Sequence, residues 1–188
     1  MAIIISRFGT EAYAAHQVGL RISSLAYLPG WGFSIAATTL VGQELGARRP
    51  DLARQATYVA FWFGLTIMCL MGIGLLVFNA QILRLFTEDV GVIASGTTVI
   101  ATCALIQPAM AASFIFSGAL RGAGDTRTTL IISVCSIWAL RLVAAYVLGV
   151  SLGLGLLGAW LGIGIDFGFR GLLFWLRFHG EKWAVVKV

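Results

Sequence analysis

Long apolar runs separated by short polar connectors make up most of the chain. A helix needs about 20 apolar residues to cross the hydrocarbon core of a bilayer. Five segments reach that length, namely 12–41, 58–78, 92–116, 130–148 and 154–176. These runs are far longer than the strands of a membrane barrel. Since backbone groups in lipid must be hydrogen-bonded within the protein, the runs are predicted to be helices. The pattern predicts an all-α, polytopic helical membrane bundle with a single membrane domain over residues 1–188.

Proline interrupts two of these runs. Pro29 lies in the sequence PGWG of the first run, and Pro108 follows Gln107 in the third. Proline removes a helical hydrogen bond, so a bend or hinge is expected at both places. In lipid, such a break is tolerated where protein or a water-filled cavity satisfies the freed backbone groups. A plain kink and the lining of a cavity are equally good interpretations of these sites.

Four residues near the two bends are therefore candidates for the lining of a substrate cavity. Gln107 offers a hydrogen-bond donor and an acceptor at the second bend, and Met110 follows it. Tyr27 and Trp31 flank the first bend, where aromatic rings either pack against neighbouring helices or present a face to a cation.

The first eleven residues, MAIIISRFGTE, do not have the features of a secretory signal peptide. They lack a basic lead-in, a long apolar core and a small-residue cleavage site. We interpret them as the last turns of another membrane helix, whose beginning precedes Met1. On this interpretation the chain is a fragment with five complete transmembrane helices and the end of a sixth.

The composition agrees with a membrane protein, because 59% of the residues are hydrophobic and only 11% are charged. Soluble domains carry about 25% charged residues. The net charge of +5 does not indicate a nucleic-acid partner, because eight of the basic residues fall in the connectors 44–54 and 119–129 and in the tail 177–188. Only Arg7 and Arg84 lie on the other side. The positive-inside rule therefore predicts that the two connectors and the C-terminal tail are cytoplasmic. The expected partner of these spans is the lipid bilayer.

Four ionisable residues fall inside apolar runs, where charge is costly. They are Arg21, Arg141, Asp166 and Arg170. Asp166 and Arg170 are four residues apart and can pair on one helix face. Arg141 should lie at a depth similar to that of Asp166. These residues either neutralise each other and hold helices together, or Asp166 is a carboxylate for ion coupling or substrate binding.

The stretch SGALRGAGDTRT, residues 117–128, is rich in glycine but does not match a phosphate-binding loop. It lacks the lysine of G-x-x-x-x-G-K-[ST], and Arg127 occupies the place of the third glycine of G-x-G-x-x-G. We expect a tight turn in which Gly122 and Gly124 adopt positive φ and Asp125 caps the next helix.

Two motifs resemble the multidrug and toxic compound extrusion (MATE) family. SGALRGAGDTR, residues 117–127, is similar to that family's loop between helices ten and eleven. AAHQ, residues 14–17, and VGQELGA, residues 41–47, are similar to its eighth helix and the turn that follows. The residues that carry the resemblance are His16, Gln17, Gly42, Gln43, Gly46, Gly118, Arg121, Gly122 and Asp125.

The resemblance implies the C-terminal lobe of a twelve-helix antiporter in a bacterial or archaeal plasma membrane. Such a protein exports organic, often cationic, compounds in exchange for Na⁺ or H⁺, by alternating access between two six-helix lobes. The missing partner would be an N-terminal six-helix lobe. Many relatives carry an acidic residue on helix ten, whereas residues 106–113, IQPAMAAS, contain none. We therefore expect the coupling-ion site in the N-terminal half, and neither a cofactor nor a metal site in this chain.

Two other functions are compatible with parts of the sequence. Three intramembrane arginines against one aspartate would suit a phosphate-bearing substrate, as in a lipid-linked oligosaccharide or polysaccharide flippase of a related fold. An intramembrane serine protease would need Ser117 beside His16 or His179. His16 is expected near the opposite end of a span and His179 lies in the tail, so we do not expect an enzyme.

Overall fold

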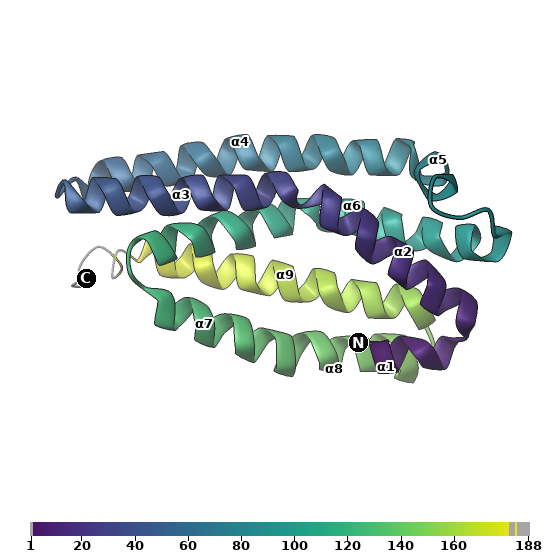
Figure 1. Cartoon of the computed structure of the whole chain (residues 1–188). Coiled ribbons are helices and arrows are strands. Elements are labelled where there is room, and N and C mark those ends of the chain that lie inside the picture. Colours follow the sequence, from purple (N-terminus) through teal and green to yellow (C-terminus); the bar gives the residue numbers. More distant parts are fainter. Residues whose placement is uncertain (1, 181–182, 184–188) are drawn as a thin grey trace.

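The computed structural model describes residues 2–180 and 183, and these residues form helices and short connectors without a strand (Figure 1). Lys182 and Lys187, two of the basic tail residues counted above, lie outside the described residues. The elements in chain order are α1 (Ala2–Ile5), the 3-10 turn η1 (Ser6–Phe8), α2 (Thr10–Ala26), α3 (Leu28–Gly46), α4 (Pro50–Val77), α5 (Asn79–Arg84), α6 (Val90–Gly122), α7 (Thr126–Cys135), the π-turn η2 (Ser136–Arg141), α8 (Leu142–Tyr146), the π-turn η3 (Val147–Ser151) and α9 (Gly155–His179).

Four helices of the described residues are long and apolar enough to cross a membrane. They are α4, α6, α9 and the continuous helix Thr126–Ser151, which comprises α7, η2, α8 and η3. The all-α membrane bundle is thus confirmed, and four of the five expected segments are single long helices. The remaining segment, residues 12–41, is divided into α2 and α3. Neither of these two helices is by itself long and apolar enough to be counted as a membrane span.

The division falls at Tyr27, two residues before the proline that predicted it. Pro29 occupies the first turn of α3, where a missing N–H is tolerated. It cannot donate to the carbonyl four residues earlier, so the hydrogen bonding of α2 does not continue through it. Figure 1 shows the result, with α2 inclined to α3 instead of extending it straight.

The helix α6 forms the centre of the bundle. In Figure 1, α3 and α4 lie along one side, α7 and α8 along the other, and α6 and α9 between them. Of the residues in the most apolar stretch of α6, 67% are buried, against 11% for Thr126–Ser151. The helix α6 therefore belongs to the core, and Thr126–Ser151 is a peripheral helix.

The helices α3 and α6 run parallel and approach closely at two glycines. A methyl group on Gly118 or Gly122 would overlap the backbone oxygens of Ser34 and Thr38 respectively. Thr38 Oγ1 donates to the Gly118 carbonyl oxygen at 2.8 Å, and Ser34 Oγ donates to that of Phe114 at 2.7 Å. Small residues four apart are a recurrent way for membrane helices to pack. The glycine-rich motif is therefore in large part a helix-packing motif.

The turn after α6 differs from the sequence-based expectation in two respects. Gly124 has a positive φ of 84°, as expected, but Gly122 is the last residue of α6 and is required for close packing. Asp125 occupies the N-cap position of α7 without a capping hydrogen bond of regular geometry, and its carboxylate accepts from Arg177 Nε at 2.8 Å. Burial raises the pKa of the Asp125 carboxyl, but Thr128 and Arg177 lower it by more, so its pKa lies below the ordinary value.

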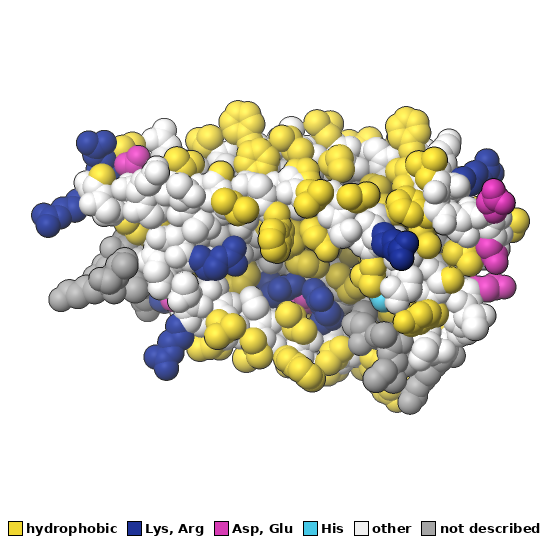
Figure 2. Space-filling model, viewed as in Figure 1, with side chains coloured by type: hydrophobic (Ala, Val, Ile, Leu, Met, Phe, Trp, Pro, Cys, Tyr) yellow, Lys and Arg dark blue, Asp and Glu magenta, His cyan; other side chains and the backbone are white. Residues whose placement is uncertain are grey.

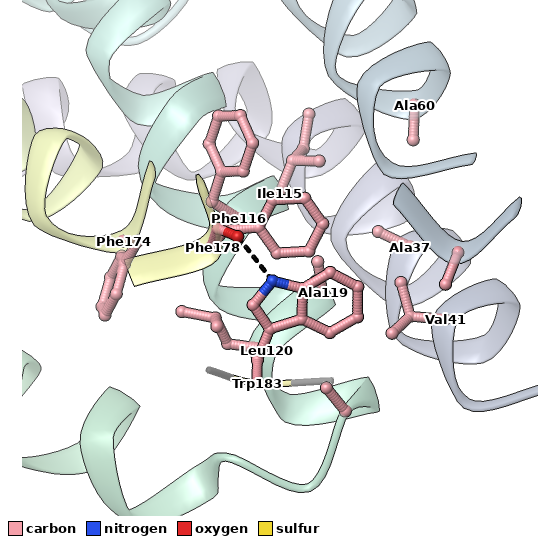
Figure 3. Packing of buried hydrophobic residues seen from close by; sticks show 12 residues of the cluster. Ala37, Val41, Ala60, Ile115, Phe116, Ala119, Leu120, Phe174, Phe178 and Trp183 are labelled. Atoms are coloured by element: carbon pink, nitrogen blue, oxygen red, sulfur yellow. Dashed lines mark hydrogen bonds between the residues drawn. The ribbon is translucent and has the colours of Figure 1, made fainter. Parts of the chain in front are cut away.

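An aromatic cluster closes the core at this end of the bundle (Figure 3). The rings of Phe178 and Trp183 stack with their centroids 4.6 Å apart, and Trp183 Nε1 donates to the Phe178 carbonyl oxygen. Phe116 of α6 lies against Phe178, with ring centroids 5.8 Å apart. The end of α9 is thereby joined to the central helix.

The close approach of α3 and α6 predicts that Gly118→Ala destabilises the fold. The added methyl meets backbone atoms that cannot rotate away, so we expect a loss of about 1–3 kcal/mol in the free energy of unfolding. Gly74→Ala on α4 is the matched control, because no heavy atom lies within 4 Å of the new methyl. SDS-induced unfolding in mixed micelles measures both. Equal stability of the two variants would contradict the packing role.

Candidate functional site

The buried carboxylate of Asp166 joins two helices near the middle of the bundle. Asp166 of α9 is fully buried, and its Oδ2 accepts from Arg141 Nε at 2.8 Å and from Arg170 at 2.7 Å. The hydroxyl of Ser136 donates to Oδ1. The structure thus brings together three of the four intramembrane charges found in the sequence, and adds a serine.

The π-turn η2 explains how both Ser136 and Arg141 reach the same carboxylate. In an α-helix, residues five apart point about 140° away from each other. A π-turn has i→i+5 hydrogen bonds and is wider, so residues five apart lie much closer to the same face. Ser136 and Arg141 are the first and last residues of η2, so the π-turn presents both to Asp166.

The two arginines that bind Asp166, Arg141 and Arg170, also lie over an aromatic ring. The guanidinium carbons of Arg170 and Arg141 lie 4.5 and 5.2 Å from the centre of the Phe167 ring. One carboxylate cannot neutralise two guanidinium groups, so this cluster keeps one positive charge. Arg170 is buried, and its Nε has no hydrogen-bond partner. The cluster is therefore a positively charged, incompletely paired site.

A first cavity of about 280 Å³ lies beside this cluster, between α2, α3, α6, α9 and η2. Its wall is mainly apolar and aromatic, with Arg141 as its charged member. Tyr27, Trp31 and Met110, which the sequence suggested as cavity residues, all line it, together with Phe114 and Phe167.

A second cavity of about 290 Å³ adjoins the first and shares Trp31 and Phe114 with it. It lies between α3, α6, α7 and α9, and its polar residues are Arg121, Arg170 and four serines. Figure 2 shows lysine or arginine side chains within the hollowed middle of the face that Figure 1 presents, in the region of α9 between α3 and α7. We refer to these two neighbouring cavities together as the groove, which has aromatic walls and basic groups.

Comparison with known proteins identifies the family of this chain. A family model described as MatE matches residues 1–147. The chain belongs to the MatE family. It is 37% identical over 93% of its length to a probable multidrug resistance protein NorM of Thermotoga maritima, of which it covers 38%. It is 34% identical over 94% of its length to the multidrug resistance protein MdtK of Yersinia enterocolitica, covering 40% of that protein, and 31% identical over 95% to a NorM of Mannheimia succiniciproducens, covering 39%.

These matches confirm the MATE resemblance found in the two motifs. The chain spans about two fifths of the length of these relatives. Their names indicate transport and not catalysis, and none of the three points to the flippase considered above. Family membership and the long apolar helices together make the chain an integral membrane protein of a multidrug efflux family.

The MATE motif residues occupy different structural positions. Gly118 and Gly122 pack against α3, and Arg121 donates to Ser34 Oγ at 3.1 Å. The motif residues near the end of α3 are exposed, and they are Gly42, Gln43 and Gly46. The glycine-rich motif therefore contributes to the second cavity, whereas the motif at the end of α3 lies on the surface.

The motif on α2 divides in the same way. His16 is buried edge-on against Trp160, with ring centroids 5.7 Å apart, and its Nδ1 has no partner. Its neighbour Gln17 is exposed. Arg21, the fourth intramembrane charge, is also exposed and lines neither cavity. These three residues lie apart from the Asp166 cluster.

Gln107, the fourth candidate for a cavity lining, lines neither of these two cavities. Its side chain is fully buried and packs toward Gly72 of α4. Pro108 cannot donate to the Ala104 carbonyl, and Gly72 has no side chain where it approaches this oxygen. Pro108 therefore lies inside the continuous helix α6, at a contact with α4 and away from the groove.

Several residues of the groove were missed by sequence reasoning. Ser136 and Phe167 belong to the Asp166 cluster, and Ser113 and Ser133 line the second cavity. Single serines and phenylalanines in apolar runs are common, so their type gave no signal. The one available signal was for Phe167, because it directly follows the charged residue Asp166 in the sequence.

The Asp166 cluster predicts a large effect of Asp166→Asn. The substitution leaves two guanidinium groups without a counter-charge, and breaking a buried ion pair in this way costs about 3–5 kcal/mol of unfolding free energy. A second change, Arg170→Gln, should recover part of the loss. Asp51→Asn, at an exposed position in the first turn of α4, is the control. A folded Asp166→Asn protein as stable as the control, in a transporter whose export ignores the ion gradient, would instead indicate a coupling carboxylate.

Proposed function

We propose that this chain forms one lobe of a secondary active multidrug efflux transporter, which exports organic compounds in exchange for Na⁺ or H⁺ by alternating access. The groove is the observation that carries this proposal. It combines two adjoining cavities, aromatic walls and a few convergent polar groups, as small-molecule sites commonly do. It lies at the level of the buried charge cluster, where transporters bind their substrates.

The architecture supports a partnership with a second lobe. Alternating access requires two bodies that move against each other around a site between them. The peripheral helix Thr126–Ser151 has few buried residues, and the groove beside it is exposed on one face (Figure 2). A second six-helix lobe placed over this face would enclose the substrate. We place the coupling-ion site on that lobe, because the helix-ten segment of this chain, residues 106–113, has no carboxylate.

The distribution of charge supports a cytoplasmic position for the end of the bundle that holds the α3–α4 and α6–α7 turns. Figure 2 shows mainly basic side chains at this end and mainly acidic ones at the other. A cysteine placed at the exposed position Arg49 should therefore be shielded from a membrane-impermeant thiol reagent in intact cells, and one at Asp89 should be labelled. The three native cysteines are replaced first, and permeabilised cells provide the control in which all sites react. Labelling at Arg49 but not at Asp89 would reverse the orientation.

The two-lobe proposal predicts that this chain exports drugs only together with its complement. We would compare the accumulation of a fluorescent drug in cells that express this chain, this chain with the N-terminal six-span part of the Thermotoga maritima relative, or neither. Export is expected only for the combination, and an ionophore that collapses the Na⁺ or H⁺ gradient should abolish it. Export by the chain alone as a monomer would overturn the two-lobe proposal. A stable combination without export of any drug tested would overturn the proposed function.

A further inference from the structure

The second cavity has a composition that the family resemblance does not predict. Among the described residues, its polar lining consists of two guanidinium groups and four hydroxyl groups, without a carboxylate. These residues are Arg121, Arg170, Ser34, Ser113, Ser117 and Ser133. A site for a cation would need acceptors, preferably charged ones. The composition is instead that of an anion site, because guanidinium and hydroxyl groups donate hydrogen bonds to carboxylates, sulfonates and phosphates.

We propose that this cavity binds the acidic group of an aromatic organic anion or zwitterion. The proposal deepens the proposed function, since it names the substrate class of the same groove. It departs from the cationic substrates that the resemblance implied.

The guanidinium groups have unused capacity for such a ligand. Arg170 donates to Asp166, yet its Nε has no partner although the side chain is buried. Arg121 donates to the hydroxyl of Ser34, and no carboxylate of the described residues pairs with it. Ser34 and Ser117 both donate to the Phe114 carbonyl, which leaves the other two serines of the lining as hydroxyl donors.

The local charge balance points in the same direction. Among the described residues around the two cavities, Arg121, Arg141 and Arg170 are positively charged and Asp166, which pairs with the last two, is the one carboxylate, so two positive charges remain. In a partly desolvated groove these charges attract an anion and repel a cation more strongly than in water.

The apolar lining indicates an organic ligand with a ring system and not a free inorganic anion. Trp31, Phe114 and Phe174 form the aromatic wall of the second cavity, and the first two continue into the first cavity. A molecule whose acidic group meets Arg121 and Arg170 therefore has an aromatic surface beside it for its rings.

The test compares three ligands of similar shape and different charge, namely naphthoate, naphthamide and naphthylmethylammonium. Binding to the chain in phosphatidylcholine nanodiscs is measured by equilibrium dialysis. We expect naphthoate to bind at least about tenfold more tightly than naphthamide, and the ammonium compound most weakly. Equal binding of all three, or tightest binding of the ammonium compound, would overturn the proposal.

Substitutions locate the site. Arg121→Gln should weaken naphthoate binding roughly 10- to 100-fold and leave naphthamide binding unchanged, because a charge-assisted hydrogen bond is lost. Arg121→Lys should retain part of the affinity. Arg21→Gln is the matched control, because it removes the same charge at a position that lines neither cavity. Equal loss in Arg21→Gln and Arg121→Gln would mean that overall charge attracts the anion, which would overturn the site.

Ser133→Ala provides a second variant in case Arg121→Gln does not fold. It should weaken naphthoate binding about 2- to 10-fold and leave naphthamide binding unchanged. Naphthoate binding that is unaffected in Ser133→Ala as well as in a folded Arg121 variant would overturn the site.

Nanodiscs of a different lipid composition distinguish an organic anion from a lipid headgroup as the ligand of the second cavity. In nanodiscs that contain phosphatidylglycerol, Arg21→Gln should still bind naphthoate more tightly than Arg121→Gln by the same factor, because the charged bilayer repels the anion equally in both. Loss of that difference would assign the cavity to an anionic lipid headgroup and overturn the organic-anion proposal. The organic-anion proposal and the proposed function can also be contradicted independently of each other. Naphthoate binding without drug export in the two-lobe cells would contradict the proposed function alone, and drug export without selective naphthoate binding would contradict this inference alone.

Discussion

The carboxylate of Asp166 is the contact on which the groove depends. The helix Thr126–Ser151 forms one wall of the groove, and only 11% of its most apolar stretch is buried. Ser136 and Arg141 of that helix both bind Asp166 of α9. A charged group in lipid is costly unless it is paired, so the carboxylate and its arginines favour the arrangement in which these helices remain together. Because so little of the helix Thr126–Ser151 is buried, apolar packing contributes less to holding it against α9 than this ion-pair cluster does.

The opposite wall is fixed by a different kind of contact. Along α3 and α6, glycines and hydroxyl groups bring the two backbones together through hydrogen bonds from side chains to carbonyl oxygens. Ser34 takes part in this contact and also lines the second cavity, where it accepts from Arg121. A change that loosened α3 from α6 would therefore displace a cavity residue as well. Helix packing and ligand binding are not separate tasks in this part of the molecule.

The sequence predicted the features that depend on hydrophobicity and on local spacing. Apolar length predicted the long helices, Pro29 predicted the break near Tyr27, and the i, i+4 spacing placed Arg170 beside Asp166. Features that depend on distant contacts were not predicted. Gly122 was expected to adopt a positive φ, but its role comes from the proximity of α3, and Gln107 is turned toward α4 by the packing of α6.

The π-turn η2 is the clearest example of a feature hidden from sequence reasoning. A regular helical pattern places Ser136 and Arg141 on different faces, and only the wider turn aligns them with Asp166. Nothing in the local sequence demands that turn. It is stabilised by a tertiary contact with α9, which periodicity within one segment cannot reveal.

The charged and the aromatic side chains of the groove are suited to different parts of a substrate. Two like charges about 6 Å apart repel by roughly 3 kcal/mol at the effective dielectric constant of about 20 that suits protein sites. A cation held over an aromatic ring gains only about 0.5–2 kcal/mol. Since two positive charges around the cavities lack a counter-charge, repulsion exceeds the attraction that Trp31 or Tyr27 can offer to a cation. Within this lobe, the aromatic side chains are therefore suited to hold the rings of a substrate, and the arginines to hold its acidic group.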